Sequence, residues 1–318
     1  MIARRLVPPL AASLAGIAAL AGCGGSEPAP APSAVRTTAA RAAAKPALCD
    51  GALRVRVTGR VASPAAGELS GLVLSQERPG VLWTHNDSGD RPRLLAVRTS
   101  GATVAEVALA GAENVDWEDI AIGPRGALLV GDIGDNLAQR PSVVVYRVPE
   151  PRATDPAGTT TTTTVAARYE LRYPGGARDA EALLFDRATG AIVIVAKSFG
   201  GDARVYVARR ASSRQVTTLR HAGTIRLGPV EAVTAGDVSA DGRTIALRTY
   251  DQAYVWRRRP GETLTAALRR DPCRADADLA GEGQAEALAL TGDGRAFVTV
   301  PEGPRPALRR YESSGRVS

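Results

Sequence analysis

EDIAIGPRGALLVGDIGDN, residues 118–136, is the stretch from which the fold can be argued. An acidic residue leads a short apolar run at 118–122, a turn with two glycines follows, and a second β-rich run occupies 127–130. Polar residues close the stretch at 132–136. Two β-rich runs separated by a glycine-containing turn indicate a pair of antiparallel strands.

The same order of features recurs, with copies that start at positions 70, 118, 181, 236 and 286. These starts are 48, 63, 55 and 50 residues apart, near the length of one propeller blade. A third β-rich run follows in every copy, at 93–97, 143–148, 205–207, 254–256 and 307–311. Each copy therefore predicts a small antiparallel sheet of three or four strands. A sandwich would not need this repeat, and a solenoid would have shorter units.

We therefore expect an all-β fold, a β-propeller with five blades. Residues 52–61 can supply the fourth strand that the last copy lacks, so that the N-terminal strand closes the ring. Six blades stay possible if 217–229 or 264–282 holds a degenerate unit. The longest spacing contains the Thr159–Thr164 run, for which we expect a surface excursion.

The N-terminal segment predicts export. Residues 1–23 combine two arginines, an apolar run and the ending Leu20-Ala21-Gly22-Cys23, which resembles a lipoprotein signal with its lipobox. Cys23 would then carry acyl chains such as palmitate and hold the protein on the outer side of a cell membrane. The alternative is an ordinary secretory signal in which Cys23 is incidental. Residues 24–48, rich in Ala and Pro, predict a flexible tether, and 49–318 a single domain.

Two cysteines remain, Cys49 and Cys273, and an oxidising compartment allows them to form a disulfide. The alternative is two buried free thiols. The expected topology speaks against the pair, because it places Cys49 at the bottom of its strand and Cys273 in a connection on the opposite face.

Composition and missing motifs exclude several function classes. The formal net charge of +7 arises from 40 basic and 33 acidic residues, a mixed balance that does not indicate a nucleic-acid partner. The two histidines, His85 and His221, have no zinc-site spacing. The chain has no P-loop, no Rossmann fingerprint, and no G-x-S-x-G elbow with a suitable histidine.

In a propeller, the starts of the inner strands converge at one mouth of the central channel. Ser70, Glu118, Glu181 and Glu286 occupy this place in four of the five copies. Carboxylate and hydroxyl oxygens suit a hard cation, so we expect one calcium ion there. The alternative is that each glutamate caps a strand or pairs with an arginine.

The loops between second and third strands lie on the same face and offer further polar residues. These are Asp87, Asp90, Asp132, Asp135, Asn136, Lys197 and Arg248, as candidate ligand-binding groups. The Asp and Gly residues of the two Asp-x-Gly-Asp tips have a plainer explanation as turn formers. Lys197 is the lone lysine of the expected domain, although a solvated side chain is the alternative.

Several stretches resemble known exported bacterial propellers. They are Ser70-Gly71-Leu72, 83–90 (WTHNDSGD), 117–121 (WEDIA), 131–136 (GDIGDN) and 284–287 (QAEA). They are similar to a loosely defined phytase-like and TolB-like group, a resemblance that implies the fold and leaves the function open. A fainter similarity reaches the calcium-activated nucleotidases, five-bladed propellers with Ser or Glu around a central calcium. Gly236 departs from that layout unless Asp237 substitutes.

Two functions from different classes follow. The first is a membrane-anchored binding or scaffold module of the cell envelope, whose partner is an envelope protein, a glycan or a small ligand. The alternative is a calcium-dependent phosphoesterase in which Lys197 and Arg248 receive phosphate oxygens. Asp87, Asp132 or His85 could then act as a base, but nothing singles out a catalytic residue.

Overall fold

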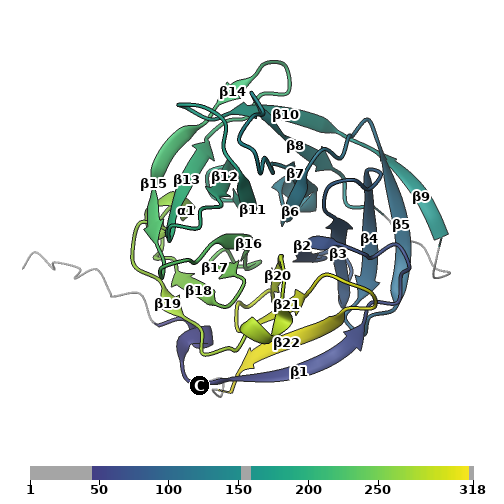
Figure 1. The fold of residues 1–318 in the computed structure, drawn as a ribbon, viewed down its shortest axis with the longest axis vertical. Helices are drawn as coiled ribbons and strands as arrows, with labels where there is room; N and C mark the ends of the chain where they lie inside the picture. The colour runs from purple at the N-terminus through teal and green to yellow at the C-terminus, as the bar shows by residue number, and fades with distance from the viewer. Residues whose placement is uncertain (1–44, 152–158, 315–318) are drawn as a thin grey trace, which may run out of the picture. The chain divides into compact units, whose positions relative to one another are not determined.

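The computed structural model describes residues 45–151 and 159–314, which form five β-sheets around a central axis (Figure 1). These residues belong to one compact unit, Ala42–Ser318. The expected signal at 1–23, with Cys23, and most of the tether lie outside the described residues. The five-bladed β-propeller is confirmed, and neither 217–229 nor 264–282 forms a sixth blade.

Each blade is named here from the axis outward. Blade one has β2 (Leu69–Leu74), β3 (Val81–Asn86), β4 (Arg93–Arg98), β5 (Thr103–Ala110) and β9 (Thr159–Thr164). Blade two has β6 (Trp117–Ile122), β7 (Leu128–Asp132), β8 (Val143–Val148), β10 (Ala167–Arg172) and β14 (Thr217–Thr218). Blade three has β11 (Ala180–Asp186), β12 (Ala191–Ala196), β13 (Asp202–Ala208) and β15 (Arg220–Arg226).

Blade four has β16 (Val233–Val238), β17 (Thr244–Thr249), β18 (Ala253–Arg257) and β19 (Cys273–Arg274). Blade five has β20 (Ala287–Leu290), β21 (Ala296–Val300), β22 (Ala307–Ser313) and β1 (Leu53–Arg60). The short helices are η1 (Ala47–Cys49), η2 (Pro124–Gly126), α1 (Leu264–Ala267) and η3 (Ala280–Glu282). No helix among the described residues is long and apolar enough to cross a bilayer.

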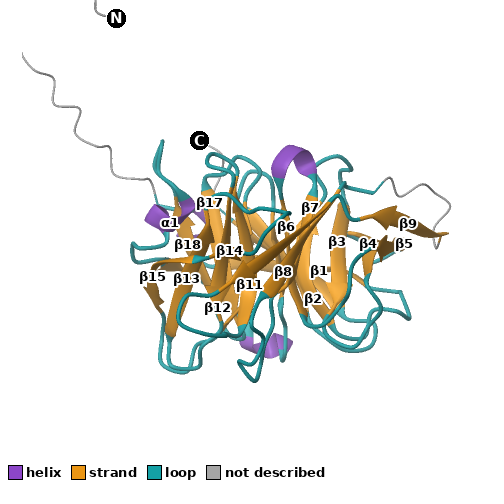
Figure 2. Cartoon of the chain, turned by 90° about the horizontal axis from the view of Figure 1, so that it is seen from above, coloured by secondary structure: helices purple, strands orange, loops and turns teal. Residues whose placement is uncertain are grey.

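The ring is closed by the N-terminal strand, as expected. β1 pairs antiparallel with β22, from Leu53 opposite Ser313 to Arg60 opposite Ala307. The threonine run is more ordered than a plain excursion, because β9 pairs in parallel with β5 and becomes an extra outer strand of blade one. Figure 2 shows the strands running between two faces that carry the loops. We call the face on which the inner strands begin the upper face.

Apolar side chains fill the spaces between neighbouring blades. Along β12, Ile192 and Ile194 pack toward blade two, whereas Val193 and Val195 pack toward blade four. Successive residues of a strand face opposite sides of the sheet, so a strand between two other blades packs apolar side chains on both faces. This explains the long apolar stretches of the inner and second strands, which polar residues such as Glu118, Asp237 and Arg248 interrupt.

The Cys49–Cys273 disulfide is present and joins blades four and five. Cys273 lies in β19, the outer strand of blade four, and Cys49 ends η1 just before β1. The topological objection was therefore wrong, because Cys273 belongs to a strand and not to a connection on the upper face. Leu48, fully buried beside this disulfide, shows that the folded chain begins slightly before residue 49.

Candidate functional site

The inner strands of four blades carry a one-residue bulge near the upper face. The register with the second strand shifts across one residue in each, and the bulged residues are Gly71, Glu118, Glu181 and Thr234. In blade five, Glu286 directly precedes β20. A bulge re-aims the side chain of its extra residue. Three glutamates thus enter the channel mouth from blades two, three and five.

Two expected positions are corrected by this register. Ser70 lies one residue before the bulge of blade one, is fully buried, and donates its hydroxyl hydrogen to the backbone carbonyl of Glu118 (2.6 Å). In blade four the bulge holds Thr234 and not Gly236. Asp237 accepts hydrogen bonds from backbone N–H groups of blades four and five, so it does not substitute. The position of a one-residue bulge could not be predicted from the sequence repeat.

Aspartates complete what we call the carboxylate cluster. One carboxylate oxygen each of Asp87, Glu118 and Glu286 lie within 4.8 Å of one another, and the same holds for Glu118, Asp179 and Glu181. Glu118 belongs to both groups, is 2% exposed, and accepts no hydrogen bond on its carboxylate from the described residues. Oε2 of Glu181 and Oδ1 of Asp87 are also buried without a partner. Buried carboxylates are costly unless a cation neutralises them, so these residues fit a metal ion.

The charges of the cluster repel one another. Burial, and then the charge of Glu181, raise the pKa of Glu118 well above its usual value. Burial, and then Glu286, do the same to the pKa of Glu181. Burial raises the pKa of Asp87 and of Asp116 to about 6, with a further contribution from neighbouring carboxylates. The cluster therefore holds protons near neutral pH that a divalent cation would displace.

Lys197 brings a positive charge from the chain itself into the cluster. Its ammonium group pairs with Glu181, lies 3.9 Å from Glu286 Oε1, and belongs to a side chain that is 9% exposed. Burial alone would lower the pKa of Lys197, but the Glu181 carboxylate outweighs it and the pKa is raised. The hydroxyl of Tyr250 donates to Glu286 Oε1 (3.0 Å). Lys197 is thus a permanent buried cation and not a solvated side chain.

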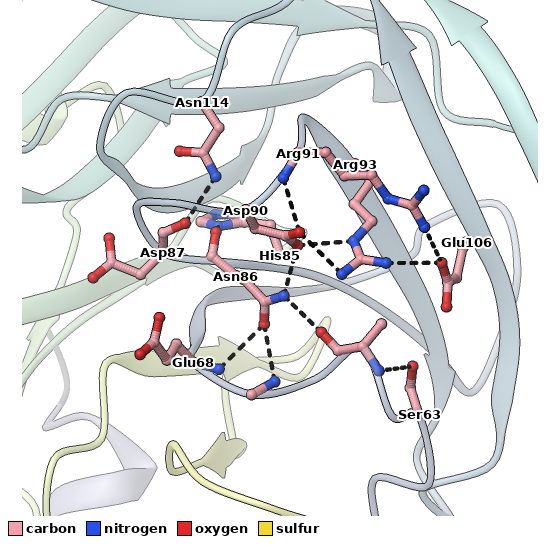
Figure 3. A network of polar contacts seen from close by, with 12 residues as sticks. Ser63, Glu68, His85, Asn86, Asp87, Asp90, Arg91, Arg93, Glu106 and Asn114 are labelled. Atoms are coloured by element: carbon pink, nitrogen blue, oxygen red, sulfur yellow. Dashed lines mark hydrogen bonds and ion pairs between the residues drawn. The ribbon is translucent and has the colours of Figure 1, made fainter.

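A hydrogen-bonded clamp positions Asp87 at the tip of blade one (Figure 3). The amide of Asn86 donates to the Ala65 carbonyl (2.6 Å) and to Asp90 Oδ2 (2.7 Å). Asp90 also pairs with Arg93 (2.8 Å), which satisfies its carboxylate. Figure 3 shows the Asp87 carboxylate pointing away from this network. Of the two aspartates in this tip, only Asp87 joins the cluster.

The tip of blade two is paired internally. Asp132 is buried, forms an ion pair with Arg140 (2.8 Å), and accepts a hydrogen bond from the Asp116 backbone (3.0 Å). Asp135 accepts two backbone N–H bonds from its own loop, both 2.8 Å long. Asn136 is exposed. These aspartates stabilise the loop, in agreement with the turn-forming alternative.

Arg248 does not reach the upper surface, which corrects its expected role. Its guanidinium is fully buried, pairs with Glu282 (3.1 Å), and donates to the backbone carbonyl of Ala287 (3.2 Å). Burial lowers the pKa of Arg248, while Glu282 opposes this effect. The side chain ties blade four to blade five and has no free donor face for a ligand.

The expected site residues include neither Asp179, a member of the carboxylate cluster, nor Asp116, which lies beside Glu118, although the sequence contains a signal for both. Each stands two residues before a bulged glutamate, in Asp116-Trp117-Glu118 and in Asp179-Ala180-Glu181. An Asp-x-Glu spacing at two inner-strand starts would have identified both. Tyr250 has no comparable signal, because it comes from a loop of blade four.

A pocket of about 640 Å³ adjoins the carboxylate cluster at the upper end of blade three. Asp179 and Lys197 line the pocket and also contribute to the cluster. The rest of its wall comes from blade three and from Ala138 at the tip of blade two. A volume of this size is typical of small-molecule sites. The upper face therefore combines a candidate metal centre with an adjacent ligand-sized pocket.

Comparisons with known proteins do not identify a family. No protein-family model matches the chain, and no curated protein matches it. A solved structure assigned as a gluconolactonase is 15% identical, with a TM-score of 0.45, and the match covers 86% of this chain and 98% of the other. A gluconolactonase from Xanthomonas campestris is 10% identical, with a TM-score of 0.44 over 82% and 89% of the two chains. Likenesses this weak assign no activity, and none supports the phytase-like, TolB-like or nucleotidase resemblance.

Proposed function

We propose that this protein is a metal-dependent hydrolase whose carboxylate cluster holds one divalent cation, calcium in the simplest case. The observation that carries the proposal is Glu118, a buried carboxylate without a hydrogen-bond donor that stands within 4.8 Å of two pairs of further carboxylates. All the available ligands are oxygens, which calcium accepts in irregular geometry and in high number. Softer metals would favour histidine or cysteine, which the cluster does not contain.

A bound cation would supply Lewis acidity and a water molecule of lowered pKa. The chain supplies the rest of the chemistry. Asp116, whose carboxylate meets that of Glu118 beside Gly134, is the best candidate for a general base, and burial raises its pKa to about 6 in the metal-free protein. Its Oδ2 and the Oε1 of Glu118 both lie within 2.5 Å of the position that a Cβ on Gly134 would occupy. Lys197 keeps its proton and stabilises negative charge.

The metal proposal is tested by thermal melting after removal of metal on a chelating resin, with and without millimolar calcium. At a calcium concentration of about one hundred times Kd, binding to the native state adds about 2.7 kcal/mol of stability. Glu118→Gln should abolish the calcium-induced rise in Tm. Glu312→Gln, which removes a surface partner of Arg310 on blade five, is the matched control and should keep it. An unchanged wild-type Tm, with no metal found by elemental analysis, would refute the proposal.

The catalytic part is tested on phosphate esters, nucleoside diphosphates, phytate, carboxylic esters and a sugar lactone, each with and without calcium. Turnover that needs calcium, and that falls at least a hundredfold in Asp116→Asn, supports the hydrolase and the role of Asp116. Calcium binding without turnover of any substrate would refute catalysis and favour the binding or scaffold function.

The location that we propose is the outer surface of a cell membrane, with a lipid on Cys23. The lipobox-like ending of residues 20–23 supports it, and so does the Cys49–Cys273 disulfide, because disulfides persist in oxidising compartments. The test is the mass of the mature N-terminus. Cleavage before Cys23 with added acyl mass is expected, and Cys23→Ala should release the protein from membranes. An unmodified cysteine in the mature protein would contradict the lipid anchor.

A further inference from the structure

The pocket beside the carboxylate cluster is lined by two arginines, Arg178 and Arg204, that form no ion pair with the described residues, although the Arg178 guanidinium lies over the Tyr206 ring, 6.0 Å from its centroid. Nε of Arg178 is buried without a hydrogen-bond partner. Arg178 is half-buried and Arg204 is exposed, whereas the buried Arg248 and the largely buried Lys197 pair with Glu282 and Glu181. Guanidinium groups that lack a carboxylate partner and line a pocket are suited to a planar carboxylate or a phosphate.

The acidic residues of the pocket do not cancel this charge. Asp179 belongs to the carboxylate cluster, where a bound cation would neutralise it, and its Oδ1 already accepts a hydrogen bond from the Asp135 backbone (2.9 Å). Asp202 is exposed at the start of β13. With the cluster neutralised, the inner pocket carries the charges of Arg178 and Arg204 beside Lys197.

Exposed apolar side chains lie on loops next to residues that line the same pocket. Leu137 is 77% exposed and directly precedes the lining residue Ala138, while Phe199 is 64% exposed and lies between two lining residues. Val230 is 83% exposed, on a loop whose Leu227 N–H donates to the Gly201 carbonyl (2.7 Å).

Val230 is also unusual in its backbone. Its φ is +61°, a conformation that is unfavourable for a β-branched residue. Together with Leu137 and Phe199, Val230 gives the upper face three exposed apolar side chains on neighbouring loops. The three apolar residues lie on loops of blades two and three and on the loop that enters blade four, all on the upper face.

We propose that the pocket binds the anionic group of an amphipathic small molecule, a carboxylate or a phosphate, while the rim of Leu137, Phe199 and Val230 contacts its apolar part. Arg178 and Arg204 hold the anion, and Lys197 orients it toward the carboxylate cluster. This inference rests on the proposed function in one respect: the bound molecule is taken to be the substrate of the hydrolase. Three basic and two acidic residues line the pocket, so its lining stays net positive in the metal-free protein, and a bound cation would strengthen anion binding.

The experiment uses calorimetric titration of resin-treated, metal-free protein with four probes. Phenylphosphonate and benzoate carry an anion on an aromatic ring, benzyl alcohol has no charge, and methylphosphonate lacks the ring. Phenylphosphonate or benzoate should bind at least tenfold more tightly than benzyl alcohol, and the better of the two identifies the anion as phosphate or carboxylate. Methylphosphonate should bind more weakly than phenylphosphonate because it misses the rim.

Variants assign the effect to residues. Arg204→Gln and Arg178→Gln should each weaken binding of the aromatic anion at least tenfold. Arg220→Gln, an exposed arginine on the outer strand of the same blade, is the control and should not change it. Phe199→Ser should weaken the binding of phenylphosphonate and leave the affinity for methylphosphonate unchanged.

Arg204 is exposed, so its variant should fold even if Arg178→Gln does not. Equal affinity for benzyl alcohol and the anions, or wild-type affinity in Arg204→Gln, would overturn the inference. The calcium melts are a separate readout: Arg204→Gln should keep the calcium-induced rise in Tm. If the wild-type protein responds to calcium but binds none of the anions, the pocket alone is refuted; if it binds the anions but does not respond to calcium, the metal site alone is refuted.

Discussion

Blades one and two deliver a carboxylate to the same channel mouth by opposite routes. In blade one the bulge position holds Gly71, with a φ of +65°, and a Cβ there would lie 2.7 Å from Nε2 of His85 and 2.9 Å from the main chain of Asp119. No side chain fits at that point. The carboxylate comes instead from Asp87, two residues beyond His85 in the second strand.

In blade two the arrangement is reversed. The bulge position holds Glu118. Asp132 pairs with Trp117, the residue before the bulge, and Gly134 follows two residues after Asp132, at the position that Asp87 has in blade one. A Cβ on Gly134 would lie 2.2 Å from Oε1 of Glu118 and 2.5 Å from the Asp116 carboxylate. The glycine therefore leaves room for the carboxylate of the inner strand.

The comparison shows that two identical sequence patterns can have different roles. The tips at 87–90 and 132–135 both match Asp-x-Gly-Asp, but strand register places Asp132 opposite the residue before the bulge, where blade one has His85. Asp132 therefore occupies the place of His85, two residues before the place of Asp87. Asp87 thus joins the carboxylate cluster, while Asp132 pairs with Arg140.

The largest effect is expected for Gly71→Ala. The positive φ and the clash with main-chain atoms of blade two together should lower the free energy of unfolding by about 2 to 5 kcal/mol. Gly89→Ala is the control, since Gly89 has a φ of +80° but open space around it, and it should cost about 1 to 2 kcal/mol. Denaturant unfolding of both variants measures the difference. Equal destabilisation would mean that the close contact of blades one and two is unimportant.

The paired variants Asp132→Asn and Asp87→Asn should separate structure from metal binding. Asp132→Asn removes the charge that holds Arg140 and should destabilise the fold by about 1 to 3 kcal/mol, with an unchanged calcium affinity. Asp87→Asn should leave the metal-free fold at least as stable as wild type at neutral pH, because it removes a partly buried charge, and should weaken calcium binding at least tenfold, about 1.4 kcal/mol. Urea unfolding and calcium titration of each variant give the two quantities. Weaker calcium binding in Asp132→Asn than in Asp87→Asn would reverse our assignment of the two tips.

A smaller effect is expected for Gly134→Ala. The new methyl group meets the ends of two flexible side chains and not the backbone, so the fold should lose only about 1 to 2 kcal/mol. Calcium affinity should fall more clearly, because Glu118 must move away from the other ligands. Calorimetric titration with calcium measures this loss, and wild-type affinity would show that Glu118 is not a ligand.

The smallest effect is on the pH dependence of stability. The folded pKa of Asp87 and Asp116, about 6, lies above the usual unfolded value of about 3.9. The folded metal-free protein thus binds protons more tightly than the unfolded chain, and its stability should fall as pH rises from about 4 to about 6. Solvent screening keeps each contribution under about 1 kcal/mol.

The pH effect can also be divided between the two blades. Asp87→Asn should remove about half of the pH dependence of the metal-free protein, and saturating calcium should reverse its sign, because calcium binds the deprotonated cluster. Melting curves at pH 4.5, 6 and 7.5 with and without calcium test both statements. Stability that rises with pH in the absence of metal would contradict the raised pKa values.

Much of the fold could be predicted from local patterns, and part of the site could not. The repeat spacing, the closing strand at 52–61 and the five blades all follow from strand and turn signals within a few residues of one another. The glutamates at 118, 181 and 286 were found for the same reason, since they begin inner strands. Ser70 and Arg248 were misplaced, because a one-residue bulge and the direction of a buried side chain depend on neighbouring blades.

The sequence by itself determined the five β-rich repeats, the two cysteines of the disulfide, and the acidic starts of three inner strands. Only the tertiary structure decided which carboxylates meet, that Lys197 is buried among them, and that Arg178 and Arg204 face a shared pocket. The physical reason is the range of the forces involved. Strand periodicity and turns are set by adjacent residues. The partners and pKa of a carboxylate are set by ring closure, which brings Asp87 and Glu286 within 4.8 Å of one another across most of the chain.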